Sequence, residues 1–225
     1  MMQRAYTFID RARAGLRLRY LLHLPPGYWE EPARQWPLVL FLHGRGERGN
    51  DINVVRKYGI AKVVDEQQDA AFIAISPQCP LAYEWPDLTD TLARLLDQAT
   101  THLPVDPKRV YLTGLSMGAR GGWLLAVEQP DRFAASALIC GRIPAPDFLE
   151  RVAVLKGKPI WVFHGAKDPV VPVENSEKIV ATLQAAGGTP RLTIYPEADH
   201  DSWTETYHNP ELYTWLFSHR REGAW

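Results

Sequence analysis

The sequence has few cysteines, no excess of charge of either sign and no long hydrophobic segment. Cys79 and Cys140 are its two cysteines, and they lie far apart in the 225 residues. We therefore expect free reduced thiols rather than a disulfide. The 25 basic residues are balanced by 26 acidic ones without a basic stripe, so nucleic acid is not an expected partner. No apolar run reaches about 18 residues, so no membrane span is expected.

The first residues also lack the features of a secretory signal. The stretch from Met1 to Tyr6 has no continuous apolar segment followed by a small-residue cleavage site. Together with the two free thiols, this predicts a cytoplasmic location. The length favours one α/β domain over residues 1–225, which can bury a substantial core. The oligomeric state is not predicted.

Strand-like and helix-like segments alternate along the chain, which predicts a mostly parallel sheet with helices on both faces. An antiparallel hairpin is expected first, with strands at residues 6–10 and 16–24. Further strands are expected at residues 38–42, 71–76, 110–113, 135–140, 160–164 and 192–195. Helices are expected at residues 53–66, 88–102, 116–128, 173–186 and 210–219.

The most informative motif is Gly114-Leu115-Ser116-Met117-Gly118, which stands between an expected strand and an expected helix. A G-x-S-x-G in this context is typical of a nucleophile elbow, a sharp turn that projects its serine above the sheet. The glycines leave out the Cβ atoms for which such a turn has no room. Ser116 is therefore the candidate nucleophile.

A serine hydroxyl needs a base to activate it, and the base needs an acid to orient it. After this turn, the partners follow in the order acid, then histidine. His200 lies in a polar loop just after the expected strand 192–195 and is the candidate base. His164 ends a strand and precedes the expected acid, while His208 and His219 fall in or near the C-terminal helix, where surface positions are expected.

The candidate acid is Asp168, which follows the expected strand 160–164 in a loop that leads into a helix. An alternative is that Asp168 only caps a turn, because Asp-Pro often begins one. Asp199 and Asp201 compete for the role. However, an immediate neighbour of His200 on the same loop rarely reaches the imidazole Nδ1 in the required geometry.

An oxyanion hole is predicted from two backbone N–H groups. One belongs to Met117, the residue after the nucleophile. The other belongs to the loop that follows an early strand of the sheet. That loop is His43-Gly44-Arg45-Gly46-Glu47-Arg48-Gly49, in which Arg45 would donate with its backbone rather than its guanidinium. Glu47 and Arg48 could fix the loop by charge-assisted bonds or could simply be solvated. We expect a structural role for Glu47. A phosphate-binding loop is less consistent, since the spacing does not match the known glycine motifs.

From about residue 18 to residue 215, the chain resembles the α/β-hydrolase superfamily. The segments at 43–49, 76–80 and 200–203 are similar to an esterase branch that includes carboxylesterases, phospholipase-type and acyl-thioesterase-type enzymes, and predicted peptidases related to polyhydroxybutyrate depolymerases. This resemblance implies ester hydrolysis through an acyl-enzyme, with a small-molecule ester as substrate and no cofactor. Short acyl chains are expected.

Three residues are predicted to line the substrate pocket: Trp85, Trp203 and Gly44. The tryptophans belong to loops near the catalytic elements. Residues 141–155 have poor periodicity and are too short for a large lid, so we expect an open pocket. This segment could form a pocket wall or an ordinary connection.

Other functions stay open at this stage. A peptidase or a thioesterase could use the same three residues. A non-catalytic binding module would be expected to lack one of them, and all are present. A metal enzyme built on His43, His164 and His200 would need a carboxylate and an open coordination position. Tight turns at the glycines that follow His43 and His164 explain those two histidines more simply.

Overall fold

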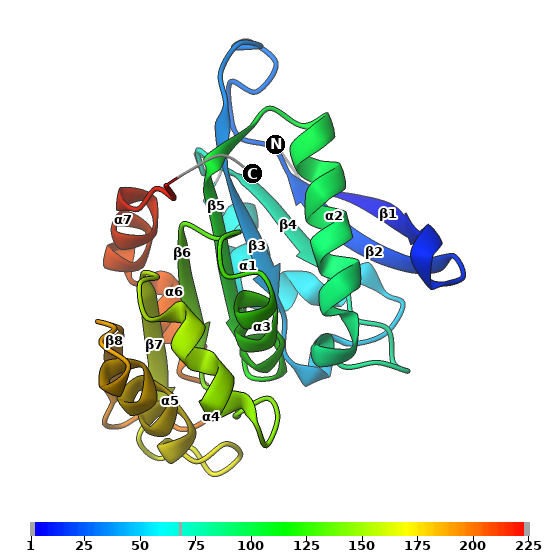
Figure 1. Ribbon diagram of the computed structural model, residues 1–225. Helices are drawn as coiled ribbons and strands as arrows, with labels where there is room; N and C mark the ends of the chain where they lie inside the picture. The colour runs from blue at the N-terminus through cyan, green and yellow to red at the C-terminus, as the bar shows by residue number, and fades with distance from the viewer. Residues whose placement is uncertain (1–2, 68, 223–225) are drawn as a thin grey trace.

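The computed structural model describes residues 3–67 and 69–222, and within them eight strands form one sheet (Figure 1). Their order across the sheet is β1-β2-β4-β3-β5-β6-β7-β8. The pairs β1–β2 and β2–β4 are antiparallel, and the remaining pairs are parallel. The strands are β1 (Arg4–Asp10), β2 (Leu16–His23), β3 (Trp36–Leu42), β4 (Ile73–Pro77), β5 (Val105–Leu115), β6 (Ala135–Ile139), β7 (Ile160–Gly165) and β8 (Arg191–Tyr195).

Helices cover both faces of the sheet, as the alternating pattern predicts (Figure 1). One face carries α2, α3, α4 and α5, and the other carries α1, α6 and α7. The α-helices are α1 (Gly59–Glu66), α2 (Thr89–His102), α3 (Met117–Glu128), α4 (Phe148–Arg151), α5 (Glu174–Ala185), α6 (Trp203–His208) and α7 (Pro210–Ser218). Short 3₁₀ helices are η1 (Arg11–Arg13), η2 (Arg45–Glu47), η3 (Ile52–Lys57), η4 (Trp85–Leu88) and η5 (Val152–Leu155).

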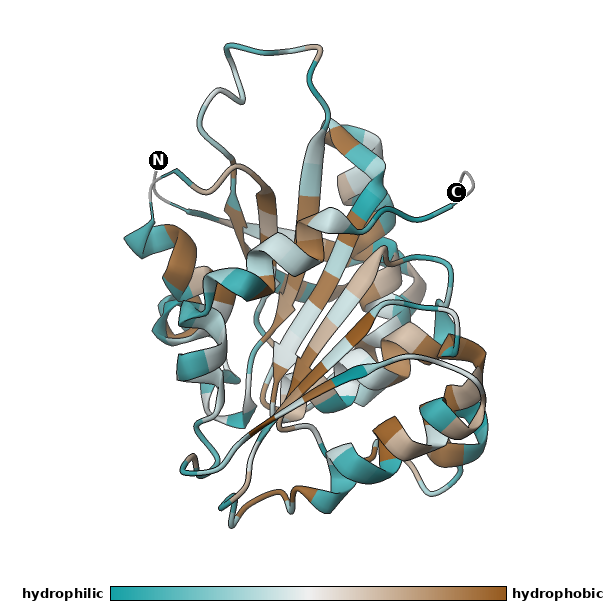
Figure 2. Cartoon of the chain, turned by 90° about the vertical axis from the view of Figure 1, so that its left-hand side faces the viewer, coloured by the Kyte–Doolittle hydropathy of each residue, from teal (hydrophilic) through white to brown (hydrophobic). Residues whose placement is uncertain are grey.

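The sheet separates two hydrophobic clusters. Along β3, Leu38 and Leu40 pack with the α2–α5 side, whereas Val39 and Phe41 pack with the α1–α7 side. Every residue of β3 is buried, as expected for a strand with helices on both faces. Figure 2 shows the same arrangement, with hydrophobic residues concentrated in the central strands and hydrophilic ones in the outer loops.

The predicted strands and helices are found with boundaries shifted by a few residues, with three corrections. One is that residues 141–155, where no element was expected, contain α4 and η5. The expected helix over residues 53–66 is split into η3 and α1. The break lies at Tyr58, which is extended with φ −142° and ψ 168°. The next residue, Gly59, has a φ of +63°, and a Cβ there would lie 2.2 Å from the ring of Phe41. The remaining correction is α6, which follows directly on the loop of His200 and was not predicted.

Two expectations from composition can be compared with the structure. Cys79 and Cys140 are both free and buried. Among the described residues, none of the helices is long and apolar enough to cross a membrane.

Candidate active site

Ser116 stands in a strained turn between β5 and α3. Its φ is +52° and its ψ is −116°, a left-handed region of φ that a residue with a Cβ rarely adopts. The Ser116 N–H donates to the carbonyl of Ile139 at the end of β6, 2.9 Å away. A Cβ on Gly118 would lie 1.9 Å from the carbonyl oxygen of Leu42. The helix therefore starts close enough to β3 that only glycine fits at that position, as the motif predicts.

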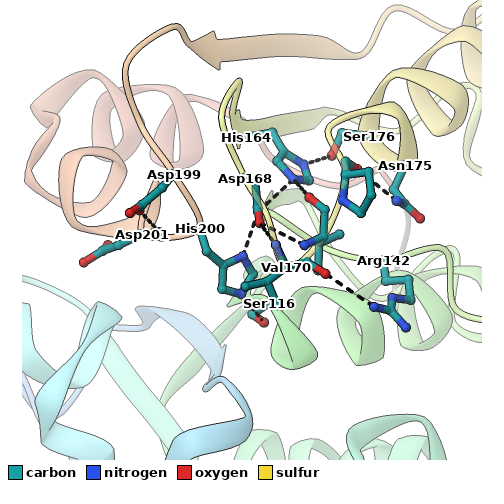
Figure 3. A network of polar contacts seen from close by, with 12 residues as sticks. Ser116, Arg142, His164, Asp168, Val170, Asn175, Ser176, Asp199, His200 and Asp201 are labelled. Carbon is teal, nitrogen blue, oxygen red and sulfur yellow. Dashed lines mark hydrogen bonds and ion pairs between the residues drawn. The ribbon is translucent and has the colours of Figure 1, made fainter.

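Ser116, His200 and Asp168 form one hydrogen-bonded chain (Figure 3). Ser116 Oγ lies 2.9 Å from His200 Nε2, and His200 Nδ1 lies 2.7 Å from Asp168 Oδ2. A carboxylate can only accept, so Nδ1 carries the proton and Nε2 is free to accept from the serine hydroxyl. This is the arrangement in which a histidine can act as a general base toward the serine.

Asp168 is held as an ionised carboxylate. Its Oδ1 accepts from the N–H groups of Val170 and Val171, each 2.8 Å away. Burial acts to raise the pKa of Asp168, but the hydrogen bonds from His200, Val171 and Val170 outweigh it and leave the pKa below its usual value. Asp168 therefore does more than cap a turn, because one oxygen closes the turn while the other binds the histidine.

The loop of His200 reaches Asp168 by packing on the end of β7. Lys167 N–H donates to the carbonyl of Ala198 at 3.0 Å. A Cβ on Gly165 would lie 2.1 Å from the carbonyl oxygen of Asp199, so a larger residue would push the loop away.

The competing aspartates make local contacts instead. Asp199 Oδ1 accepts from the Asp201 N–H, and Asp201 binds the N–H and hydroxyl of Thr204 near the start of α6. Figure 3 shows that the Asp168 carboxylate, and not either of these two, faces the imidazole.

The two predicted oxyanion donors lie at the starts of helical segments. Met117 is the first residue of α3 and Arg45 is the first of η2. The first N–H groups of a helix have no partner within it, so they are available to an anion. A Cβ on Gly44 would lie 3.9 Å from the Cβ of Ser116, which places this loop beside the nucleophile. The side chain of Arg45 is 70% exposed and lies 3.3 Å from Glu84. The predicted contribution of Arg45 to the oxyanion hole is its backbone N–H.

The loop with Arg45 is anchored to the segment after β4. Cys79 N–H donates to His43 Nε2 at 3.0 Å, and the Trp85 indole donates to the His43 carbonyl at 2.9 Å. Arg48 donates to the carbonyls of Leu81 and Tyr83. Burial lowers the pKa of His43 to about 4, so this histidine is neutral at physiological pH.

Trp85 therefore has a different role from the predicted one. It is completely buried, and its ring packs against that of His43 with 5.0 Å between centroids. Its indole N–H donates to the His43 carbonyl, so it supports the predicted oxyanion loop (residues 43–49). It is not a wall of the substrate pocket.

Glu47 is also part of this loop and is not simply solvated. Only 6% of the residue is exposed, and its carboxylate lies 4.0 Å from His43 Nδ1. Burial raises the pKa of Glu47, against the charge of Lys57 and hydrogen bonds from the N–H groups of Gly44 and Glu47 itself. The expectation of a structural role is consistent with these contacts.

A cavity of about 490 Å³ opens above Ser116 and His200. Gly44 and Trp203 line it, as the sequence predicts. The ring of Trp203 lies edge-on to His200, with 5.3 Å between centroids. Other lining residues, which the sequence did not single out as pocket residues, include Lys57, Tyr58, Glu84, Leu115, Arg120, Arg142, Val170 and Val171.

These additional lining residues lie mostly in the segments that connect the helices and strands, outside the predicted motifs. Lys57 and Tyr58 lie at the break between η3 and α1. The sequence predicts one continuous helix there, without this break. Glu84 holds Arg120, with 2.6 Å between the charged groups, and also faces Arg45. From residues 141–155, Arg142 reaches the cavity.

A metal centre on His43, His164 and His200 does not match the contacts. His43 accepts from Cys79, whereas His164 binds Ser176 and Asp168. Among the described residues, the group with suitable spacing is Cys140, Asp168 and His200, whose atoms lie within 4.8 Å of one another. The Asp168 and His200 atoms already bind each other, and burial raises the pKa of the Cys140 thiol well above its usual value.

Comparison with known proteins identifies the family of this chain. The family model of the dienelactone hydrolase family matches residues 82–212, more than half of the chain. The chain belongs to the dienelactone hydrolase family. This segment includes Ser116, Asp168 and His200.

Individual relatives are similar over most of the chain. A protein named "Putative esterase NocK" from Nocardia uniformis subsp. tsuyamanensis is 31% identical over 190 residues, 79% of this chain and 53% of the relative. A poly(3-hydroxyoctanoate) depolymerase from Pseudomonas fluorescens is 26% identical over 74% of this chain and 67% of its own. The crystal structure of a thermostable esterase superposes with a TM-score of 0.83 at 34% identity, covering 97% of this chain and 63% of that one. The chain thus spans about half to two thirds of the length of these relatives.

Proposed function

We propose that this chain is a serine hydrolase that cleaves carboxylic esters with short acyl groups. The observation that carries the proposal is the chain from Ser116 Oγ through His200 to Asp168, which faces a cavity beside two helical N-termini. Membership of the dienelactone hydrolase family and similarity to proteins named as esterases support it.

The first half of the reaction transfers the acyl group to Ser116. His200 Nε2 takes the hydroxyl proton while Oγ attacks the ester carbonyl carbon. The N–H groups of Arg45 and Met117 bind the negative oxygen of the tetrahedral intermediate. Asp168 stabilises the imidazolium that forms on His200. When the intermediate collapses, the bond to the alkoxy group breaks, and His200 gives its proton to the departing alcohol.

Water completes the reaction. His200 removes a proton from a water molecule, which attacks the acyl carbon and forms a second tetrahedral intermediate. Its collapse breaks the bond to Ser116 Oγ and returns the proton to the serine. The products are one alcohol and one carboxylic acid, and neither half requires a cofactor.

Apolar side chains beside the nucleophile favour a short acyl chain. Leu115, Met117, Val170 and Val171 line the cavity next to Ser116. Charged side chains also line the cavity, among them Lys57 and Arg142, and the Arg142 guanidinium lies 3.5 Å from the Val170 carbonyl. A long alkyl chain would cover more of this partly charged wall than an acetyl or butyryl group does, so the mixed lining supports a short acyl chain.

A substrate panel tests the proposal. Purified protein is assayed with p-nitrophenyl acetate, butyrate and decanoate, with an acyl-CoA thioester and with peptide p-nitroanilides, each with and without EDTA. We expect the highest kcat/KM on acetate or butyrate and no effect of the chelator. A preference for the thioester or the peptide would replace the ester proposal with a thioesterase or a peptidase.

The matched control is Ser116→Ala. It should lower turnover by about 10⁴-fold or more, because loss of a triad member removes the nucleophilic route. Circular dichroism should show an unchanged fold. Near-parent hydrolysis by this variant would rule out Ser116 as the nucleophile, and absence of turnover on the whole panel would favour a binding module.

A further inference from the structure

His164 lies beside the proposed catalytic acid, on the side opposite His200. It belongs to the end of β7 and is completely buried. Its Nε2 lies 3.2 Å from Asp168 Oδ2 and 2.9 Å from the carbonyl oxygen of Val171. Its Nδ1 lies 2.7 Å from Ser176 Oγ on α5. Figure 3 shows the His164 ring between Ser176 and the Asp168 carboxylate.

These contacts determine which nitrogen carries a proton. Both neighbours of Nε2 are oxygens that can only accept, so Nε2 must be the N–H donor. One proton is then shared between Asp168 Oδ2 and the Val171 carbonyl. On the other side of the ring, the Ser176 hydroxyl lies within hydrogen-bond distance of Nδ1.

The same contacts also stabilise the turn that holds Asp168. Val171 donates its N–H to Asp168 Oδ1 and accepts from His164 with its carbonyl. His164 therefore binds both the carboxylate and the backbone that holds the carboxylate. Asp168 Oδ2 has two N–H donors, from His164 and His200, and its direction depends on both.

We propose that His164 is a positioning residue of the active site, which holds Asp168 Oδ2 toward His200 through its Nε2–H. This inference rests on the proposed function, since it assigns a role within the same catalytic chain. The hydrogen-bonded series then runs from α5 to the nucleophile: Ser176, His164, Asp168, His200, Ser116.

The charge of Asp168 gives this role a measurable consequence. Each N–H that binds Oδ2 takes up part of its negative charge. If the His164 donor is lost, more of that charge acts on His200, which then holds a proton more strongly. The acidic limb of the kcat/KM profile should move to higher pH. A residue that only filled space would not move this limb.

Other charged and titratable groups around this centre do not substitute for His164. Cys140, at the end of β6, stays protonated because burial raises its pKa. Asp199 and Asp201 flank His200 but make the local contacts described above. Arg142 donates to the Val170 carbonyl, 3.5 Å away, rather than to the carboxylate.

Two conservative substitutions separate the contact with Asp168 from the contact with Ser176. In His164→Gln, the side-chain amide N–H can occupy the place of Nε2 and reach Asp168. In His164→Asn, the shorter amide can occupy the place of Nδ1 and reach Ser176 only. Both variants keep a polar side chain in the same buried site, so they form a matched pair.

The experiment measures kcat, KM and the pH profile for p-nitrophenyl butyrate, together with the low-field proton resonance of His200 Nδ1–H. We expect His164→Asn to lower kcat about tenfold, in line with a hydrogen bond to a charged group, with KM within about twofold. Its acidic limb and its resonance should both shift. His164→Gln should stay close to the parent in all three measurements.

Equal kcat values, or equal losses with an unmoved acidic limb and resonance, would overturn the proposal. If His164→Asn does not fold, the double variant His164→Leu/Ser176→Ala takes its place, because it replaces both partners with apolar groups. The resonance needs no substrate. A parent protein inactive on every substrate would therefore refute the proposed function, while the resonance would still decide the role of His164.

Discussion

The backbone N–H of Cys79 donates a hydrogen bond to Nε2 of His43, 3.0 Å away, and this bond joins the oxyanion loop to the segment after β4. Because Nε2 accepts, the proton of the neutral ring is on Nδ1, which lies 2.6 Å from the Gly44 carbonyl. His43 can keep this bond only while its Nε2 is unprotonated. The geometry of the oxyanion loop is thus linked to the protonation of a buried histidine.

This link predicts a loss of stability in mild acid. Burial lowers the pKa of His43 from 6.5 to about 4, so the unfolded chain binds a proton at higher pH than the folded protein. The contribution is fully present above pH 6.5 and is lost as the pH falls toward about 4. At about 1.4 kcal/mol for each pKa unit, the loss reaches about 3 kcal/mol.

Urea unfolding of the parent and of His43→Gln, at several pH values between 7 and 4.5, measures this effect. Glutamine can accept from Cys79 but does not titrate. The free energy of unfolding of the parent should therefore fall more steeply with decreasing pH than that of the variant. Parallel profiles would show that His43 is not the source of the dependence.

Arg45 should contribute through its backbone. The guanidinium is exposed and faces Glu84, so Arg45→Ala should keep kcat within a few-fold of the parent. Arg45→Pro removes the N–H and should lower kcat by about 100- to 1,000-fold. Proline suits the first position of a helix, and Gly44 before it is already extended, with φ −75° and ψ −175°.

Steady-state kinetics with p-nitrophenyl acetate and thermal melting of both variants decide this point. The melting temperatures should stay close to that of the parent. A large fall in kcat for Arg45→Ala would assign the function to the side chain instead.

The fold and the hydrogen-bonded chain of the candidate site could be predicted because their signals are local. Ser116, Asp168 and His200 each follow a strand at the carboxyl edge of the sheet, and parallel strands bring such positions together. The strands themselves are apolar runs of the kind that is buried on both faces.

The cavity walls could not be predicted in the same way, because the direction of a loop side chain depends on distant contacts. Trp85 lies between β4 and α2, in a segment predicted to be near the site, yet its ring is buried and packs against His43. Tyr58 lines the cavity at the break between η3 and α1, next to Gly59, where Phe41 leaves no room for a Cβ. The sequence around His164 is consistent with a tight turn, whereas the fold brings its ring to Asp168.

The choice among the three aspartates is testable by single amide substitutions. Asp168→Asn should lower kcat by up to about 10⁴-fold, because an amide cannot hold the His200 tautomer or stabilise its imidazolium. Asp199→Asn and Asp201→Asn should have small effects, since those carboxylates bind local backbone and Thr204. The three variants are compared in kcat on p-nitrophenyl butyrate at neutral pH. If Asp199→Asn or Asp201→Asn inactivated the protein while Asp168→Asn stayed active, the role of the acid would belong to the loop of His200 instead.

The tight turn at Ser116 predicts that a single methyl group at Gly118 abolishes the site. A Cβ there would lie 1.9 Å from the Leu42 carbonyl oxygen and 2.7 Å from that of His43, and backbone atoms cannot rotate away as a flexible side chain could. The start of α3 must then shift away from β3 and carry the Met117 N–H with it. Gly118→Ala should therefore lose nearly all esterase activity.

Stability should fall in the same variant. Overpacking of this kind costs about 1–3 kcal/mol or more, and each kcal/mol lowers the melting temperature by roughly 2–4 °C in a domain of this size. Gly157→Ala is the matched control, because nothing lies within 4 Å of a Cβ at that position. It should leave both activity and melting temperature close to the parent values. If Gly118→Ala behaved like Gly157→Ala, the close approach of α3 to β3 would not be what places Ser116 beside its oxyanion donors.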